Sequence, residues 1–221
     1  MIIDIGGIKG GGGKTTLATN LAVIRSSINS KKVLLVDADD QRSTTDWAEH
    51  RESIGVTTPF TTICLTGSAV KNQVYKMMND YDDIIIDTGG RDTSSQRAAL
   101  MIADIFLAPF QPRSLDVWTV GKVSTLVRDA QDINGKLVAY AVINRADSQG
   151  TDNAAAGEII QAEGLHLIDV RIGQRKAFSN AASEGLSVIE LKYKDEKANA
   201  EILKLSEIIF NCKIAVSLAS V

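Results

Sequence analysis

The chain has 221 residues, of which 44% are hydrophobic and 23% are charged. This length and balance predict a globular chain with a buried core, and they exclude collagen-like, fibrous and disordered proteins. The formal net charge of −3 excludes the overall basic excess of typical duplex-binding domains. No apolar run approaches the roughly 20 residues of a membrane-spanning helix, and residues 1–8 hold no Lys or Arg, so we expect a cytoplasmic protein.

Short β-branched runs alternate with helical periods along the chain, which is the pattern of parallel βαβ units. The predicted fold class is therefore α/β, as one domain over residues 1–221 with a mostly parallel, twisted sheet flanked by helices. About seven strands are predicted, at residues 2–5, 32–36, 60–65, 83–86, 105–109, 137–144 and 165–170.

Three segments carry hydrophobic residues at helical spacing. The first spans residues 17–28, and the second spans residues 115–130 after a cap at Ser114. We expect both to lay one face on the sheet. A last helix, which we expect to close the fold, is predicted from a stripe of Ala198, Ile202, Leu205 and Ile209.

The two cysteines and the two histidines lack metal-binding spacing. Cys64 and Cys212 have no CxxC or Cys/His partner, so the sequence predicts neither a disulfide framework nor a zinc site. We expect both cysteines to fill the core, and we assign no role to His50 or His166.

A glycine-rich loop lies between the first predicted strand and the first predicted helix. Six of the 17 glycines fall between Gly6 and Gly13, where residues without a Cβ let backbone N–H groups curl around phosphate oxygens at a helix N-terminus. Lys14 is predicted to reach the β and γ phosphates, and Thr15 to offer its hydroxyl to Mg²⁺. The predicted nucleotide-binding residues of this loop are Lys9, Gly10, Gly11, Gly12, Gly13, Lys14, Thr15 and Thr16.

The loop departs from the strict phosphate-loop pattern, because Ile8 stands where the first glycine is expected. It matches K-G-G-x-G-K-[ST] from Lys9 to Thr15 instead, and here the sequence resembles the deviant Walker A family of ATPases that includes ParA, MinD and the nitrogenase iron protein. The resemblance implies that ATP and Mg²⁺ are the cofactors. It also implies that Lys9 is the signature lysine, which reaches into the partner's site across a homodimer in the ATP state.

Acidic residues follow the second predicted strand, at the sheet edge where ligands bind in open α/β sheets. The run Asp37-Ala38-Asp39-Asp40-Gln41 resembles the family's switch I motif, D-x-D-P-Q. That match implies that Asp39 orients or activates the attacking water near Mg²⁺ and that Asp37 supports Mg²⁺ or the loop. Asp40 replaces the motif's proline, which leaves open which of the three carboxylates faces the metal.

The fourth predicted strand ends in Asp87, which fits a Walker B carboxylate that holds Mg²⁺ or its water. Gly89 and Gly90 would let the following backbone, switch II, approach the γ-phosphate and change conformation. Asn144 ends a later strand where the family places an adenine-reading asparagine, so the resemblance implies that its amide pairs with the base edge. The predicted catalytic residues are Lys9, Lys14 and Asp39, and the predicted metal-site residues are Thr15, Asp37, Asp39 and Asp87.

The resemblance to small ParA-type partition ATPases implies non-specific binding to double-stranded nucleoid DNA and hydrolysis stimulated by a ParB-type centromere-binding or cargo-adaptor protein. No helix-turn-helix segment precedes Ile2, so we expect no operator-specific binding. Phosphate contacts need clustered cations, and the last third of the chain concentrates Arg171, Arg175, Lys176, Lys192, Lys194 and Lys197.

Two other functions use this fold. A MinD-like positioning ATPase would bind a membrane through a basic amphipathic helix, whereas residues 211–221 carry a single cation, so we expect no membrane partner. An ATP-dependent metabolic ligase would need a second substrate pocket, and we find no further catalytic constellation after Asp87. The cargo of a partition ATPase, plasmid, chromosome or protein assembly, is not specified by these motifs.

Overall fold

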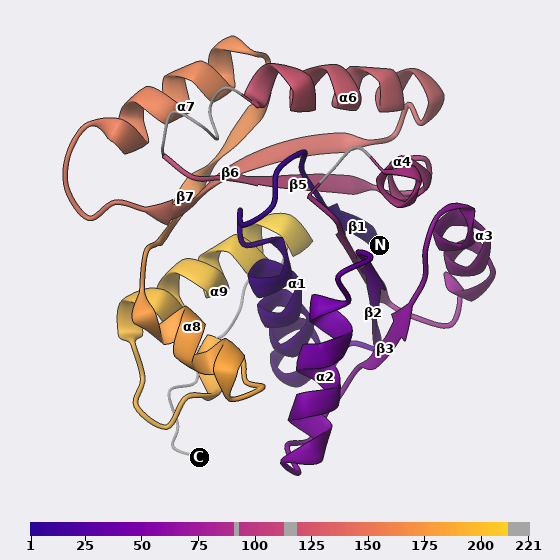
Figure 1. Cartoon of the computed structure of the whole chain (residues 1–221), viewed down its shortest axis with the longest axis vertical. Coiled ribbons are helices and arrows are strands. Elements are labelled where there is room, and N and C mark those ends of the chain that lie inside the picture. The colour runs from indigo at the N-terminus through magenta and orange to yellow at the C-terminus, as the bar shows by residue number, and fades with distance from the viewer. Residues whose placement is uncertain (91–92, 113–118, 212–221) are drawn as a thin grey trace.

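The computed structural model describes residues 1–90, 93–112 and 119–211. Within them, seven parallel strands form one sheet in the order β3-β2-β4-β1-β5-β6-β7 (Figure 1). The α/β class and the seven predicted strands are thereby confirmed. The strands are β1 Ile2–Ile5, β2 Val33–Ala38, β3 Thr61–Cys64, β4 Asp83–Thr88, β5 Ile105–Phe110, β6 Val138–Ala146 and β7 His166–Gly173.

Helices cover both faces of the sheet (Figure 1). One face packs against α1, α2, α8 and α9, and the other against α3, α4, α6 and α7. The helices are α1 Lys14–Val23 with the π-helical turn η1 Ile24–Ile28, α2 Ser43–Ser53, α3 Ser68–Met77, α4 Ser94–Leu100, α6 Val120–Ile133, α7 Asp152–Ala162, α8 Lys176–Ser183, the 3₁₀ turn η2 Val188–Glu190 and α9 Glu196–Phe210.

The central strands are buried on both sides, because each sends alternate apolar side chains to opposite layers. In β4, Ile84 and Ile86 join the α3-side core, while Ile85 joins the α1-side core. Full burial of such a side chain stabilises the fold by roughly 1.5–3 kcal/mol. The register of this rigid sheet places Asp37 beside Asp87 at its C-terminal edge.

The predicted helical stripes are borne out where the structure describes them. The stripe of α9 is buried throughout. In the first helix, Leu17 and Ile24 are buried, but Ile28 is 40% exposed because the helix widens into the π-helical turn η1. The second predicted helix begins at Val120 in the described chain, and Ser114, Leu115 and Trp118 lie outside the described residues.

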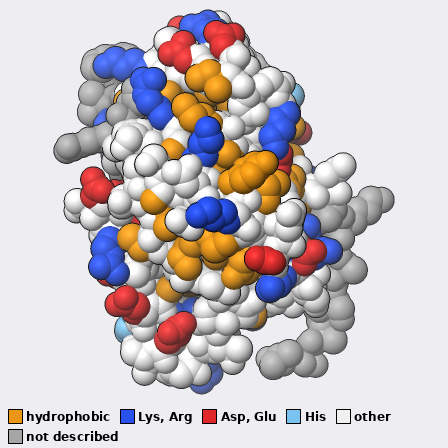
Figure 2. All heavy atoms as spheres, turned by 90° about the vertical axis from the view of Figure 1, so that its right-hand side faces the viewer, with side chains coloured by type: hydrophobic (Ala, Val, Ile, Leu, Met, Phe, Trp, Pro, Cys, Tyr) orange, Lys and Arg blue, Asp and Glu red, His pale blue; other side chains and the backbone are white. Residues whose placement is uncertain are grey.

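The edge of the sheet at β3 is more open than the sequence predicted. Cys64 is exposed on this edge strand, which corrects the expectation of a core cysteine, and Cys212 lies outside the described residues. Figure 2 shows hydrophobic side chains gathered among Lys and Arg on the side of the molecule that carries α3. Tyr75 and Met78 are among the exposed hydrophobic residues. Within the described ranges, no helix has the length and apolarity needed to cross a bilayer.

Candidate nucleotide site

The glycine-rich loop connects β1 to α1, and glycine geometry shapes its second half. Gly11 and Gly13 have φ angles of +82° and +90°, in the left-handed region that side chains disfavour. A Cβ on Gly13 would lie 2.1 Å from Nδ2 of Asn144. Gly13 is also the N-cap residue of α1, so the loop leads its backbone directly to the positive end of a helix.

The two loop lysines have different environments. Lys14, the first residue of α1, is 7% exposed, and its Nζ donates to the backbone oxygen of Lys9 at 3.1 Å. Lys9 itself is exposed at the start of the loop. The ammonium of Lys14 is therefore folded over its own loop, where it would meet a bound phosphate.

One carboxylate oxygen of Asp87, on β4, is hydrogen-bonded to residues of both α1 and α2. Its Oδ2 accepts hydrogen bonds from Thr15 Oγ1 of α1 and Thr44 Oγ1 of α2, both at 2.6 Å. Its Oδ1 is buried and has no hydrogen-bond partner within the part of the chain that the structure describes. Burial raises the pKa of Asp87 to about 6, against the lowering effect of the two hydroxyls. An unsatisfied carboxylate oxygen beside the Thr15 hydroxyl fits the oxygen ligands that Mg²⁺ prefers.

Asp37 accepts three hydrogen bonds from switch I and the first turn of α2. Its Oδ1 accepts the backbone N–H of Asp39 at 3.2 Å, and its Oδ2 accepts the N–H and Oγ1–H of Thr45 at 2.7 and 2.8 Å. Through these bonds the Asp37 carboxylate holds switch I and the first turn of α2 in place. A direct metal contact of Asp37 stays a prediction.

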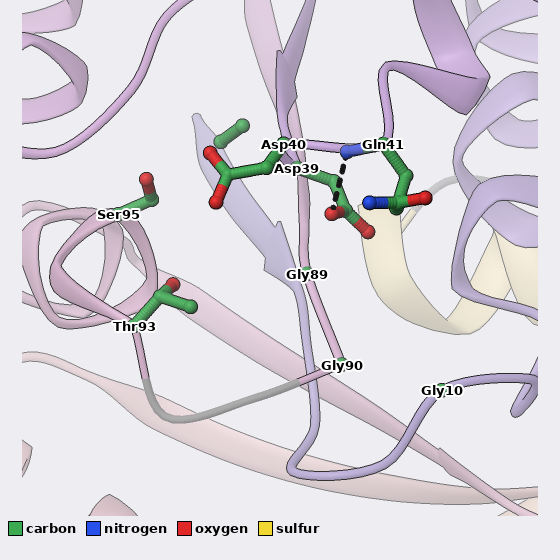
Figure 3. A pocket seen from close by; sticks show the side chains of 9 residues that line it. Gly10, Asp39, Asp40, Gln41, Gly89, Gly90, Thr93 and Ser95 are labelled. Carbon is green, nitrogen blue, oxygen red and sulfur yellow. Dashed lines mark hydrogen bonds between the residues drawn. The ribbon is translucent and has the colours of Figure 1, made fainter.

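Asp39 lies beside switch II in a hollow of about 420 Å³ (Figure 3). Its Oδ1 accepts the backbone N–H of Gln41 at 3.1 Å, and a Cβ on Gly89 would lie 3.2 Å from that oxygen. A Cβ on Gly90 would lie 2.5 Å from the backbone nitrogen of Gly10. The two glycines therefore let switch II pass between Asp39 and the phosphate loop. The hollow is lined by Gly10, Ala38, Asp39, Asp40, Gln41, Gly89, Gly90, Thr93 and Ser95.

Asp4 is a buried carboxyl that no sequence motif indicated. It lies in the middle of β1 with no exposed surface, and its Oδ1 accepts from Thr88 Oγ1 at 2.9 Å. Burial raises its pKa to about 8, and the nearby carboxylate of Asp87 also contributes to the rise. The sequence does contain a feature that could have identified this residue, because Asp4 is an acidic residue inside the apolar run Ile-Ile-Asp-Ile. Thr44 was missed as well, because its spacing from Asp87 is set only by the tertiary fold.

Asn144 lies at the phosphate loop. It is 4% exposed, and its Nδ2 donates to the backbone oxygen of Gly12 at 2.6 Å. Asn144, Gly13 and Thr16 line a hollow of about 630 Å³ that extends to α8. The pairing of the Asn144 amide with a base stays a prediction.

The predicted basic residues occupy two neighbouring segments. Arg171 lies on β7, Arg175 and Lys176 lie at the start of α8, and the others lie at Lys192, Lys194 and Lys197 around the start of α9. Arg175 forms an ion pair with Glu201 of α9, and this hydrogen bond raises its pKa. The Nζ of Lys194 donates to the backbone oxygen of Ile189 at 2.6 Å. Two of the predicted cations are therefore partly engaged inside the chain.

The family CbiA, the CobQ/CobB/MinD/ParA nucleotide binding domain, matches residues 3–188, which include the loop, both switch segments and Asn144. The chain belongs to this family. Its nucleotide-binding assignment and its resemblance to ParA and MinD are thereby confirmed.

Similar proteins have matching lengths. Maintenance of carboxysome distribution protein A from Halothiobacillus neapolitanus is 28% identical over 212 residues, covering 94% of this chain and 95% of that protein. Protein ParA from Rhizobium radiobacter is 24% identical over 205 residues, covering 91% and 90%. The structure of an ATP complex of a Cyanothece McdA variant is 19% identical with a TM-score of 0.80, and it covers 98% of both chains. This last likeness establishes a shared fold.

Proposed function

We propose that this member of the family is a Mg²⁺-dependent ATPase that dimerises on binding ATP and positions a DNA or protein cargo. The observation that carries the proposal is the convergence of Lys14, Thr15 and Asp87 at the phosphate loop, with Asp39 alongside. The ATP complex of the structurally similar McdA variant supports ATP as the nucleotide.

Each residue has a role in the proposed reaction. The loop amides and Lys14 bind the phosphates, and the Thr15 hydroxyl and Asp87 hold Mg²⁺, which neutralises phosphate charge when bound. Asp39 orients the attacking water beside switch II, and Asn144 contacts the base. Lys9, which is exposed at the start of the loop, reaches the phosphates of a second copy.

The proposed partners are duplex DNA and a ParB-type or cargo-adaptor protein. The names of two relatives, a carboxysome distribution protein and a ParA, support cargo positioning over metabolism. Lys176 and Lys197 are exposed cations that would contact phosphates without reading sequence. Hydrolysis, stimulated by the partner, would then time release from DNA.

The decisive experiment measures duplex DNA binding at low and moderate salt with ADP, ATP and a non-hydrolysable ATP analogue, together with the molecular mass in each state. We expect salt-sensitive, sequence-indifferent binding by a dimer in the ATP state only. A dimer that does not bind DNA but co-sediments with lipid vesicles would favour a MinD-like function. A protein that stays monomeric with every nucleotide and uses ATP to activate a carboxylate substrate would favour a ligase.

The Lys9→Ala variant tests the dimer separately. We expect it to bind ATP and to remain monomeric, because the cation that bridges the two nucleotide sites is lost. An ATP-dependent dimer of normal stability in this variant would contradict the role of Lys9 across the interface.

A further inference from the structure

Thr44 is a buried hydroxyl at the point where switch I becomes a helix. The chain turns at Arg42, whose φ angle is +53°, and α2 begins at Ser43. Thr44 follows with no exposed surface, and its Oγ1 lies 2.6 Å from Oδ2 of Asp87. Thr15 of the neighbouring helix α1 donates to the same oxygen, so two hydroxyls from adjacent helices hold Oδ2 of Asp87.

The far end of α2 is fixed by a second buried contact. Arg51 is 1% exposed, and its two terminal nitrogens donate to Glu190 at 2.7 and 2.6 Å. The same guanidinium donates to the backbone oxygens of Thr57 and Gly185. Arg51 therefore fixes the C-terminal end of the helix whose first turn carries Thr44.

The orientation of the Asp87 carboxylate depends on these donors. Rotation about the last torsion of an aspartate is broad and roughly two-fold, so hydrogen bonds select its plane. With both hydroxyls on Oδ2, the other oxygen is left without a partner among the described residues. Removing the Thr44 hydroxyl would leave Oδ2 with the Thr15 donor alone, so the plane of the carboxylate would be less restrained.

We propose that Thr44 is a positioning residue that orients the Asp87 carboxylate for Mg²⁺. The inference rests on the proposed function of this site as a Mg²⁺-nucleotide site, and it adds a residue outside the motifs that define the loop and the strand ends. Thr44 acts through Asp87, so it affects the metal and leaves the phosphate contacts of Lys14 intact.

Calorimetric titration of Mg²⁺ into the ADP-bound protein tests this inference. We expect Thr44→Val to bind Mg²⁺ about tenfold more weakly, because a hydrogen bond to a charged group is lost. Thr44→Ser, which keeps the hydroxyl, should bind Mg²⁺ within about twofold of the wild type. ADP affinity measured in EDTA should be the same in all variants.

The matched control is Thr62→Val on β3, which removes a buried hydroxyl that has no hydrogen-bond partner in the described chain. It should leave Mg²⁺ binding unchanged, and Thr44→Ala replaces Thr44→Val if the latter does not fold. Normal Mg²⁺ affinity in the folded Thr44 variant would overturn the inference alone. A wild-type protein that binds neither ADP nor Mg²⁺ would overturn the proposed function as well.

Discussion

The nucleotide edge of the sheet and the basic segment from β7 to α9 differ in how their side chains are held. At the nucleotide edge, Asp37 and Asp87 are buried, and they accept hydrogen bonds from neighbouring elements. In the basic segment, Lys176 and Lys197 are exposed, and Arg175 is engaged by Glu201. Packing and hydrogen bonds therefore fix the side chains of the first region. The exposed lysines of the second region would act through their charge, without a fixed geometry.

The largest expected effect is the loss of nucleotide binding in Lys14→Ala. The variant should bind ATP about 1,000-fold more weakly or worse, because the ammonium folded over the loop is the nearest cation to the expected phosphates. Calorimetry with Mg²⁺-ATP measures it, with Lys197→Ala as the control from the basic segment. Equal ATP affinities of the two variants would contradict the assignment of the nucleotide site to the phosphate loop.

The next effect concerns the anchoring of α2. Arg51→Met keeps the apolar stem but leaves Glu190 and two backbone oxygens without the guanidinium, so it should destabilise the fold by about 3 kcal/mol in urea. Arg42→Met is the matched control, since the Arg42 side chain forms an exposed pair with Glu49 at 3.8 Å in the part of the chain that the structure describes. We expect that control to change stability by less than about 0.5 kcal/mol. Similar losses in both variants would show that burial does not strengthen the Arg51 pair.

Asp4 makes the stability of the nucleotide edge depend on pH. Its pKa of about 8 in the fold means that the folded state keeps a proton which the unfolded chain releases above pH 4. Stability should therefore fall as pH rises through this window, by up to about 2.5 kcal/mol between pH 5 and pH 7.

Urea unfolding of the wild type and of Asp4→Asn checks this slope. Asn stays neutral and can still accept from Thr88, so the variant should lack that part of the pH dependence. The charges of Asp87 and Lys14 that face residue 4 are present in both proteins, so the difference between the two curves reports the titration of Asp4 together with its interaction with these two charges. Parallel curves for the two proteins would show that Asp4 is ionised in the fold.

The smallest effect is expected in the basic segment. Replacing Lys176 and Lys197 by Ala should weaken ATP-dependent DNA binding several-fold and lower the salt slope by about one for each phosphate contact that the dimer loses. Lys122→Ala, on α6 at the opposite layer, is the control. An unchanged salt slope in the double variant would place the DNA surface elsewhere and leave the nucleotide edge as the one region correctly assigned.

Local sequence was sufficient for the loop and the strand ends. The glycines, Lys14 and Asp87 act at positions set by a strand followed directly by a turn, so their placement needs no knowledge of distant residues. Thr44 and Arg51 were not predictable in this way. Arg51 meets Glu190, which is 139 residues away, and hydrophobic periodicity carries no information about such a pair.

By itself, the sequence determined the α/β class, the seven strands and the phosphate loop, because hydrophobic period and glycine content act over a few residues. Only the tertiary structure decided which oxygen of Asp87 is satisfied, that Asp37 accepts hydrogen bonds from Thr45 of α2, and that Arg175 is paired with Glu201. These outcomes depend on directional hydrogen bonds between different elements of the fold, and such bonds exist only once the sheet has set the register of its edge.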